Sequence, residues 1–252
     1  MSTILRILVL LLVLVSSHLK ADTLGIYLSA SNWKPDISGN IESFGPAISL
    51  NDTLGFTDDS GSQLSIRFEH PIPGLPNIGI QNNIFDSMAS ATLNQSITYD
   101  GVIYAVNTDV TSTLDFSHQD IILYYEILDN WISLDLGINV MNFDGEFNLV
   151  PGSTGPTVTR SDTTLDEMVP ALYGMVQFDF PATGLYVGGT LSYIGVDEDN
   201  FTKTKLLVGW ESEVGLGLEV GYQSFAAEWE DFNDSNGNID LDGYYASVVF
   251  HF

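Results

Sequence analysis

The sequence contains no cysteine, which excludes disulfide bonds, thiolate catalysis and cysteine-ligated metals. Basic residues are also scarce: 7 Lys and Arg stand against 33 Asp and Glu, which gives a formal net charge of -26. A chain this acidic repels phosphate backbones, so nucleic acid is excluded as a partner. Hydrophobic residues still make up 44% of the 252 positions, which is too many for a disordered chain. The composition therefore indicates a folded and strongly acidic protein.

The one long apolar run lies at the N-terminus. Arg6 is followed by an apolar stretch over 7–15, then by two serines and the small residue Ala21. This order is typical of a secretory signal. The run is too short to cross a bilayer, which takes roughly 20 apolar residues. We therefore predict a signal peptide over residues 1–21 and a single exported domain over residues 22–252.

Beyond residue 21 the sequence has few helix signals, and apolar residues recur at every second position instead. Leu134, Leu136 and Ile138 alternate with polar or small neighbours, and so do Leu216 and Leu218. This period is that of a β-strand with one apolar face. Ten segments show it: 22–34, 63–70, 77–86, 114–128, 131–145, 166–180, 184–196, 201–211, 215–229 and 240–252.

The connections between these segments alternate between short and mostly long. The long ones, rich in Asp, Asn, Ser, Thr and Gly, cover 35–62, 87–113, 146–165 and 230–239. Short turns on one side and long loops on the other are typical of outer-membrane barrels. We therefore predict an all-β fold, a transmembrane antiparallel up-and-down β-barrel of about ten strands, with eight strands as the alternative.

A soluble sandwich would show the same alternation, so the residue types on the polar faces have to distinguish it from a membrane barrel. They carry mostly Gly, Ser, Thr, Asn, Gln and Tyr, which suit the crowded inside of a narrow barrel better than a water-facing sheet. The charged residues expected to point inward are Arg67, Glu69, Asp120, Glu126, Asp135, Lys203, Lys205 and Glu219. Confined charges need partners. A three-residue turn at 212–214 would set Lys205 opposite Glu219, and we predict an ion pair between them in the lumen.

Aromatic residues near the segment ends predict girdles at the membrane interfaces. The candidates are Trp33, Trp131, Phe178, Phe180 and Trp210. The final segment carries a further pattern, because Tyr244, Val248, Phe250 and the terminal Phe252 share one face. Outer-membrane barrels of Gram-negative bacteria end in this way, and the resemblance implies that these four residues form a membrane-assembly signal.

Two stretches of the mature chain carry a more specific resemblance. The start, Asp22-Thr-Leu-Gly-Ile-Tyr followed by Asn32-Trp33-Lys34-Pro35, and the end, from Asp242-Gly243-Tyr244-Tyr245 to Phe250-His251-Phe252, resemble a family of small outer-membrane β-barrel proteins from marine gammaproteobacteria. That family has no assigned activity. The resemblance therefore implies a fold and a location, and no chemistry.

One histidine could support catalysis. His118 lies near the outer end of its segment beside Asp115, Ser117 and Asp120, and it could serve as a general base at the rim. Strand parity puts Ser117 on the opposite face, however, and no second motif supports a hydrolase. A polar rim residue is the plainer interpretation of His118.

We expect no cofactor and no dedicated metal site. The acidic stretch 231–242 resembles a calcium loop, but its ligand spacing fails, which leaves weak divalent-cation binding by acidic loops as an open alternative. The sequence thus predicts a monomeric, integral outer-membrane protein of the cell envelope, with a narrow side-chain-filled lumen and acidic extracellular loops. Its expected role is structural, adhesive or related to small solutes. The expected partners are outer-membrane lipid, lipopolysaccharide and the barrel-assembly machinery. The alternatives are a porin-like narrow channel for small or hydrophobic solutes, and a rim hydrolase using His118.

Overall fold

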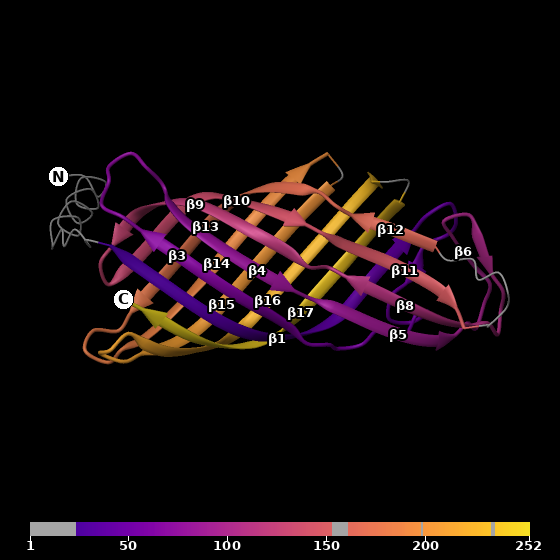
Figure 1. Cartoon of the computed structure of the whole chain (residues 1–252), viewed down its shortest axis with the longest axis horizontal. Helices are drawn as coiled ribbons and strands as arrows, with labels where there is room; N and C mark the ends of the chain where they lie inside the picture. The colour runs from indigo at the N-terminus through magenta and orange to yellow at the C-terminus, as the bar shows by residue number, and fades with distance from the viewer. Residues whose placement is uncertain (1–23, 153–160, 198, 233–234) are drawn as a thin grey trace, which may run out of the picture.

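The chain is folded almost entirely into β-strands (Figure 1). A computed structural model describes residues 24–152, 161–197, 199–232 and 235–252. The expected signal peptide, residues 1–21, lies outside the described residues. Within the described part of the chain, no helix is long and apolar enough to cross a membrane.

Ten strands form a closed antiparallel barrel, in which each strand pairs with the next barrel strand along the chain and the last pairs with the first. The barrel strands are β1 (Gly25–Glu42), β3 (Gly61–Glu69), β4 (Asn77–Ile84), β9 (His118–Asp129), β10 (Ile132–Phe143), β13 (Met168–Asp179), β14 (Leu185–Val196), β15 (Asp199–Glu211), β16 (Leu216–Phe232) and β17 (Ser235–His251). They correspond to the ten predicted segments, so the predicted fold is confirmed with ten strands and not eight. Because the barrel is closed, each of its ten described strands has a neighbour on both sides.

Seven shorter strands extend the molecule beyond the barrel end that lies opposite the start of β1 and the C-terminus (Figure 1). They are β2 (Ile48–Ser49), β5 (Asp86–Thr92), β6 (Ile97–Tyr99), β7 (Val102–Tyr104), β8 (Asp109–Asp115), β11 (Gly145–Pro151) and β12 (Ser161–Leu165). The order β12-β11-β8-β5 makes a four-stranded sheet, and β6 pairs with β7. We call this part, with the adjoining ends of β1, β16 and β17, the head. The stretches that we expected to be long loops are thus largely regular structure.

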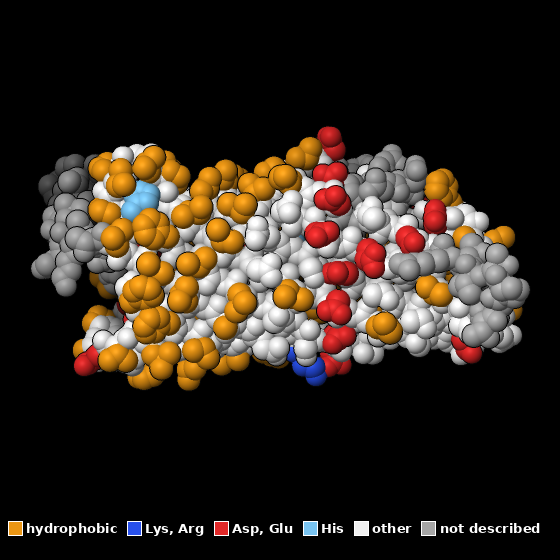
Figure 2. All heavy atoms as spheres, in the orientation of Figure 1, with side chains coloured by type: hydrophobic (Ala, Val, Ile, Leu, Met, Phe, Trp, Pro, Cys, Tyr) orange, Lys and Arg blue, Asp and Glu red, His pale blue; other side chains and the backbone are white. Residues whose placement is uncertain are grey.

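The apolar face of the strands changes sides along the barrel. On β16, Leu218 and Val220 point outward and are 58% and 59% exposed, whereas Phe225, seven residues beyond Leu218, points inward and is 1% exposed. On β17, Val248 is 50% exposed, whereas Ile239 is buried. The outward apolar residues form a band around the barrel near the termini (Figure 2). The inward ones form the core of the head, so the two ends of one strand are built for different surroundings.

Acidic side chains mark the limit of this apolar band. Figure 2 shows acidic side chains in a row across this face of the molecule, between the barrel part, where hydrophobic side chains are dense, and the head, where they are sparser. Asp36 pairs with Asp242 across β1 and β17, and Asp115 lies between Asp86 and Glu146 on neighbouring strands. We call these five residues the acidic belt. The outer surface therefore changes from apolar to anionic within a short distance along the strands.

The core of the head is closed by hydrogen-bonded aromatic residues. Tyr99 is fully buried, its ring packs edge-on against Phe147 at 5.2 Å, and its hydroxyl lies 2.7 Å from Thr163 Oγ1. Burial raises the pKa of Tyr99 to about 12, which keeps the phenol neutral. Tyr104 donates its hydroxyl proton to the Leu149 carbonyl at 3.0 Å. The head is therefore a packed structure and not a set of solvated loops.

One predicted interfacial aromatic residue is placed differently from the others. Trp131, Phe178, Phe180 and Trp210 face outward and are between 42% and 50% exposed. The prediction for Trp33 was wrong. Its side chain is only 5% exposed, and its indole Nε1 donates to the Gly243 carbonyl at 3.3 Å. Trp33 has the inward parity of β1 and joins the buried core that continues into the head.

Candidate functional site: the polar lumen

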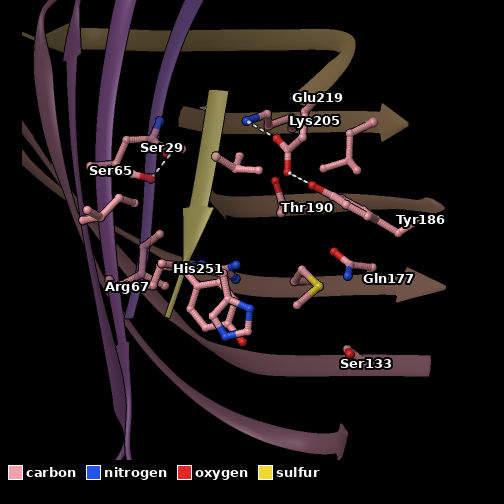
Figure 3. A pocket seen from close by; sticks show the side chains of 18 of the residues that line it. Ser29, Ser65, Arg67, Ser133, Gln177, Tyr186, Thr190, Lys205, Glu219 and His251 are labelled. Carbon is pink, nitrogen blue, oxygen red and sulfur yellow. Dashed lines mark hydrogen bonds and ion pairs between the residues drawn. The ribbon is translucent and has the colours of Figure 1, made fainter. Parts of the chain in front are cut away.

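A cavity of about 450 Å³ occupies the lumen at the terminal end of the barrel, and we take it as the candidate site. Hydroxyl and amide groups line it from several strands (Figure 3). Ser29 and Ser65 share a hydrogen bond of 2.6 Å between β1 and β3. Ser133, Gln177 and Thr190 project from β10, β13 and β14. This polar lining follows from the alternation, because the apolar side of these strands faces outward.

The expected ion pair between Lys205 and Glu219 lies in this cavity. Lys205 Nζ is 3.9 Å from Glu219 Oε2, and Tyr186 donates its hydroxyl proton to Glu219 Oε1 at 3.0 Å (Figure 3). The register that we predicted for the pair was wrong, because Lys205 pairs with Gln223 and Glu219 pairs with Gly209. The ladder pairs Glu211 with Gly217, and the partner of Lys205 is therefore four positions beyond the predicted Glu219. The two side chains still meet, because both point into a narrow lumen.

A second cation is held by aromatic rings. The Arg67 guanidinium lies 4.7 Å from the centre of the Tyr27 ring, and Tyr27 stacks on His251 at 4.0 Å. His251 Nδ1 is 3.4 Å from Glu211 Oε1. The last strand thereby contributes to the cavity wall as well as to the outer surface, through residues of alternating parity.

The cavity ends at a buried cluster centred on Lys203. Its ammonium contacts Asp120 Oδ2 at 2.5 Å, Asn83 Oδ1 at 3.2 Å and His118 Nε2 at 3.2 Å. Asp120 is 1% exposed, and its second oxygen accepts a hydrogen bond from Asn139 at 3.0 Å. We call these five residues the lysine cluster. Sequence parity indicated that Lys203 and Asp120 point inward, but nothing in the sequence indicated that they meet.

Aromatic rings cover the lysine cluster on the side of the head. The rings of Phe116, Phe143, Phe201 and Phe225 pack against one another with centroids 5.1 to 6.5 Å apart. His118 joins them, with its ring 4.8 Å from Phe143 and 5.6 Å from Phe225. We call these four phenylalanines the aromatic layer. It separates the polar cavity from the apolar core of the head.

His118 is thus enclosed in the lumen and does not lie at an open rim. Its Nδ1 lies 3.0 Å from the Phe116 carbonyl, which can only accept a hydrogen bond. With Nδ1 as the donor, neutral Nε2 is free to accept from the Lys203 ammonium. Ser117 points elsewhere and accepts a hydrogen bond from the Phe85 amide. These contacts place His118 beneath the aromatic layer, with its ring nitrogens directed at the Phe116 carbonyl and the Lys203 ammonium.

The remaining site expectations concern metals and the final strand. Among the described residues, no group of three or more His, Asp or Glu side chains is arranged to hold a metal ion. Tyr244, Val248, Phe250 and Phe252 all face outward on the last strand and its end, with exposed fractions from 38% to 77%. Their shared face agrees with the alternation that we used to group them.

Comparison with solved structures identifies the class of the fold. No protein-family model and no curated protein matches the chain. Among solved structures, the chain is similar to the outer-membrane protease OmpT from Escherichia coli, with 10% identity over 92% of this chain and 98% of that one and a TM-score of 0.54. It also aligns with Ail of Yersinia pestis, with 11% identity over 89% of this chain and 99% of that one, at a TM-score of 0.37. The fold is that of a bacterial outer-membrane β-barrel.

Proposed function

We propose that this chain is an integral outer-membrane protein of a Gram-negative bacterium and that its head works at the cell surface as a binding or adhesive platform. The observation that carries the proposal is the change of apolar face along the strands. β1 and β16 have 18 and 17 residues, whereas about 9–11 are needed to cross a bilayer. The outward apolar band accounts for the membrane crossing, and the remaining length supports the head.

The closed lumen favours this role over a channel. The lysine cluster and the aromatic layer fill the lumen between the cavity and the head, whereas wide aqueous pores need roughly 16 strands. Steady single-channel steps of the purified protein in a planar bilayer would support the channel alternative instead. The structure gives the hydrolase alternative little support, because His118 is buried and its two ring nitrogens contact the Phe116 carbonyl and the Lys203 ammonium.

The charge of the head indicates what it would bind. The acidic belt carries five carboxylates just beyond the apolar band, and the chain as a whole has a net charge of -26. Such a surface attracts basic partners over a distance of about 8 Å at physiological ionic strength. The proposed partner is therefore a basic surface, in addition to the surrounding lipid and lipopolysaccharide. Insertion by the barrel-assembly machinery, through the four aromatic and apolar residues of the last strand, belongs to the same proposal.

Adhesion to a surface coated with a basic protein tests the function. We expect cells that display the protein to be retained better than cells without it, and we expect added NaCl to abolish the difference. The double variant Asp36→Asn/Asp242→Asn should be retained severalfold less well, because it removes two belt charges that face each other. Glu213→Gln is the matched control, since this exposed carboxylate lies in the β15–β16 turn at the terminal end. Equal retention of cells with and without the protein would refute the proposed role.

A further inference from the structure

A second pocket, of about 290 Å³, lies in the barrel wall near the limit of the apolar band. Its lining includes Phe116, Phe143, Met168, Val196, Phe201 and Trp229. Met168 and Val196 are 68% and 57% exposed, whereas Phe116 and Phe143 are 3% and 4% exposed. The pocket therefore runs from the outer surface to the aromatic layer.

The pocket exists because two neighbouring strands part at their outer ends. The β13–β14 ladder ends at the pair Leu172 and Tyr193. Beyond it, β13 stays on β10, with Met168 opposite Asn142, while β14 stays on β15, with Val196 opposite Asp199. Pro170 lies in the stretch of β13 that pairs with β10 but not with β14, and it has no N–H to donate to a ladder. The lateral opening is thus a consequence of the sequence at this point.

The lining of the pocket selects for one class of ligand. Its floor is aromatic, and its only charged lining residues among those described are Glu167 and Asp199. Both residues are exposed; Glu167 directly precedes β13, and Asp199 begins β15 opposite Val196, the last residue of β14. An apolar body would gain free energy on the floor, and a positive head would be attracted by the carboxylates and by the ring faces. The volume is near the lower end of small-molecule pockets, roughly 300–1,000 Å³.

We propose that this pocket binds a small organic cation with an apolar body, such as an alkyl- or arylalkylammonium. The body lies against the phenylalanines, and the ammonium stays near Glu167 and Asp199. A lipid chain with an anionic headgroup is the competing occupant, and its headgroup would meet the same two carboxylates as like charges. The proposal depends on the parted strands and their lining, and it does not require the adhesive role of the head.

Calorimetric titration of the folded protein in phosphatidylcholine nanodiscs tests the pocket. The probes are octyltrimethylammonium, octanesulfonate and 1-octanol, each corrected for empty nanodiscs. We expect saturable binding of the ammonium and at least tenfold weaker binding of the sulfonate. Equal affinity for the two ions, or no saturable ammonium binding, would overturn the proposal.

Variants of the pocket residues test whether the ammonium binds in this pocket. Glu167→Gln/Asp199→Asn should weaken ammonium binding about fivefold or more and leave 1-octanol binding unchanged, because only the charge contacts are lost. Asp86→Asn, in the acidic belt and outside the pocket lining, is the matched control and should bind the ammonium as the unmodified chain does. Trp229 lines the pocket, so its fluorescence should report the same titration, and Trp229→Phe should lose that optical change while heat is still released. A loss of ammonium affinity as large in Asp86→Asn as in the double variant would assign the binding to the general surface charge and overturn the pocket.

Discussion

Leu218→Arg is expected to destabilise the folded barrel by about 2–4 kcal/mol, because it places a charge in the hydrocarbon that the apolar band faces. Leu218 points outward from β16 and is 58% exposed, between Leu216 and Val220 on the same face. An Arg substitution in a buried protein core would also destabilise the fold, but the Leu218 side chain contacts lipid, and not protein core, in the proposed arrangement. The loss should appear in the free energy of unfolding from phospholipid vesicles, and as a smaller fraction of heat-modifiable protein on a gel.

The control for this variant lies on the same face of the same strand. Ala226 has the parity of Leu218, but it lies in the head, where it pairs with Asp240. Ala226→Arg should therefore change the free energy of unfolding by less than about 1 kcal/mol, since the new charge is hydrated and faces a carboxylate. Equal losses in the two variants would contradict a membrane boundary between them.

Lys203→Met is expected to cost about 3–5 kcal/mol, because it leaves the buried Asp120 carboxylate without its main partner. Lys203 Nζ and Asp120 Oδ2 are 2.5 Å apart, and the two side chains are only 11% and 2% exposed. The double variant Lys203→Met/Asp120→Asn should recover much of this loss, since the lone charge is then absent as well. Urea or guanidinium unfolding of the four proteins in the cycle measures the coupling.

Lys34→Met provides the surface comparison. Lys34 also contacts a carboxylate, that of Asp58, but these two side chains are 63% and 46% exposed. Its loss should destabilise the protein far less than the loss of Lys203 does, because exposed ion pairs contribute little. If Lys203→Met were as mild as Lys34→Met, the lysine cluster would not be the structural centre of the lumen.

The sequence predicts the ten barrel strands well because the period of two is strong and local. It also predicts which charges point inward, since parity alone decides this. It fails at Trp33, because the apolar face changes sides between Leu28, which is exposed, and Trp33, which is buried. A prediction that assumes one orientation along the whole segment misses this change. The change of apolar face between Leu28 and Trp33 is the sequence signal for both the buried tryptophan and the head.

The lysine cluster could not be predicted in this way. Asp120 and Lys203 are 83 residues apart and come from strands that are not neighbours in the barrel. Their contact depends on how the side chains fill the lumen, which no local pattern records. Lys205 and Glu219 show that a local pattern also fails to predict register. The two partners were predicted, but the predicted strand register was wrong by four positions.

In the proposed arrangement, the outer face of β16 passes from lipid into water between Tyr222 and Ala226. Single nitroxide labels placed along β16 at 218, 220, 222, 226, 228 and 230 test it most directly, and the chain has no native cysteine to interfere with labelling. In lipid vesicles, oxygen should reach the first three labels better than a water-soluble nickel complex does, and the preference should reverse at the last three. If all six labels were equally accessible to the nickel complex, or if the preference for oxygen did not reverse between positions 222 and 226, the proposed membrane boundary would be contradicted.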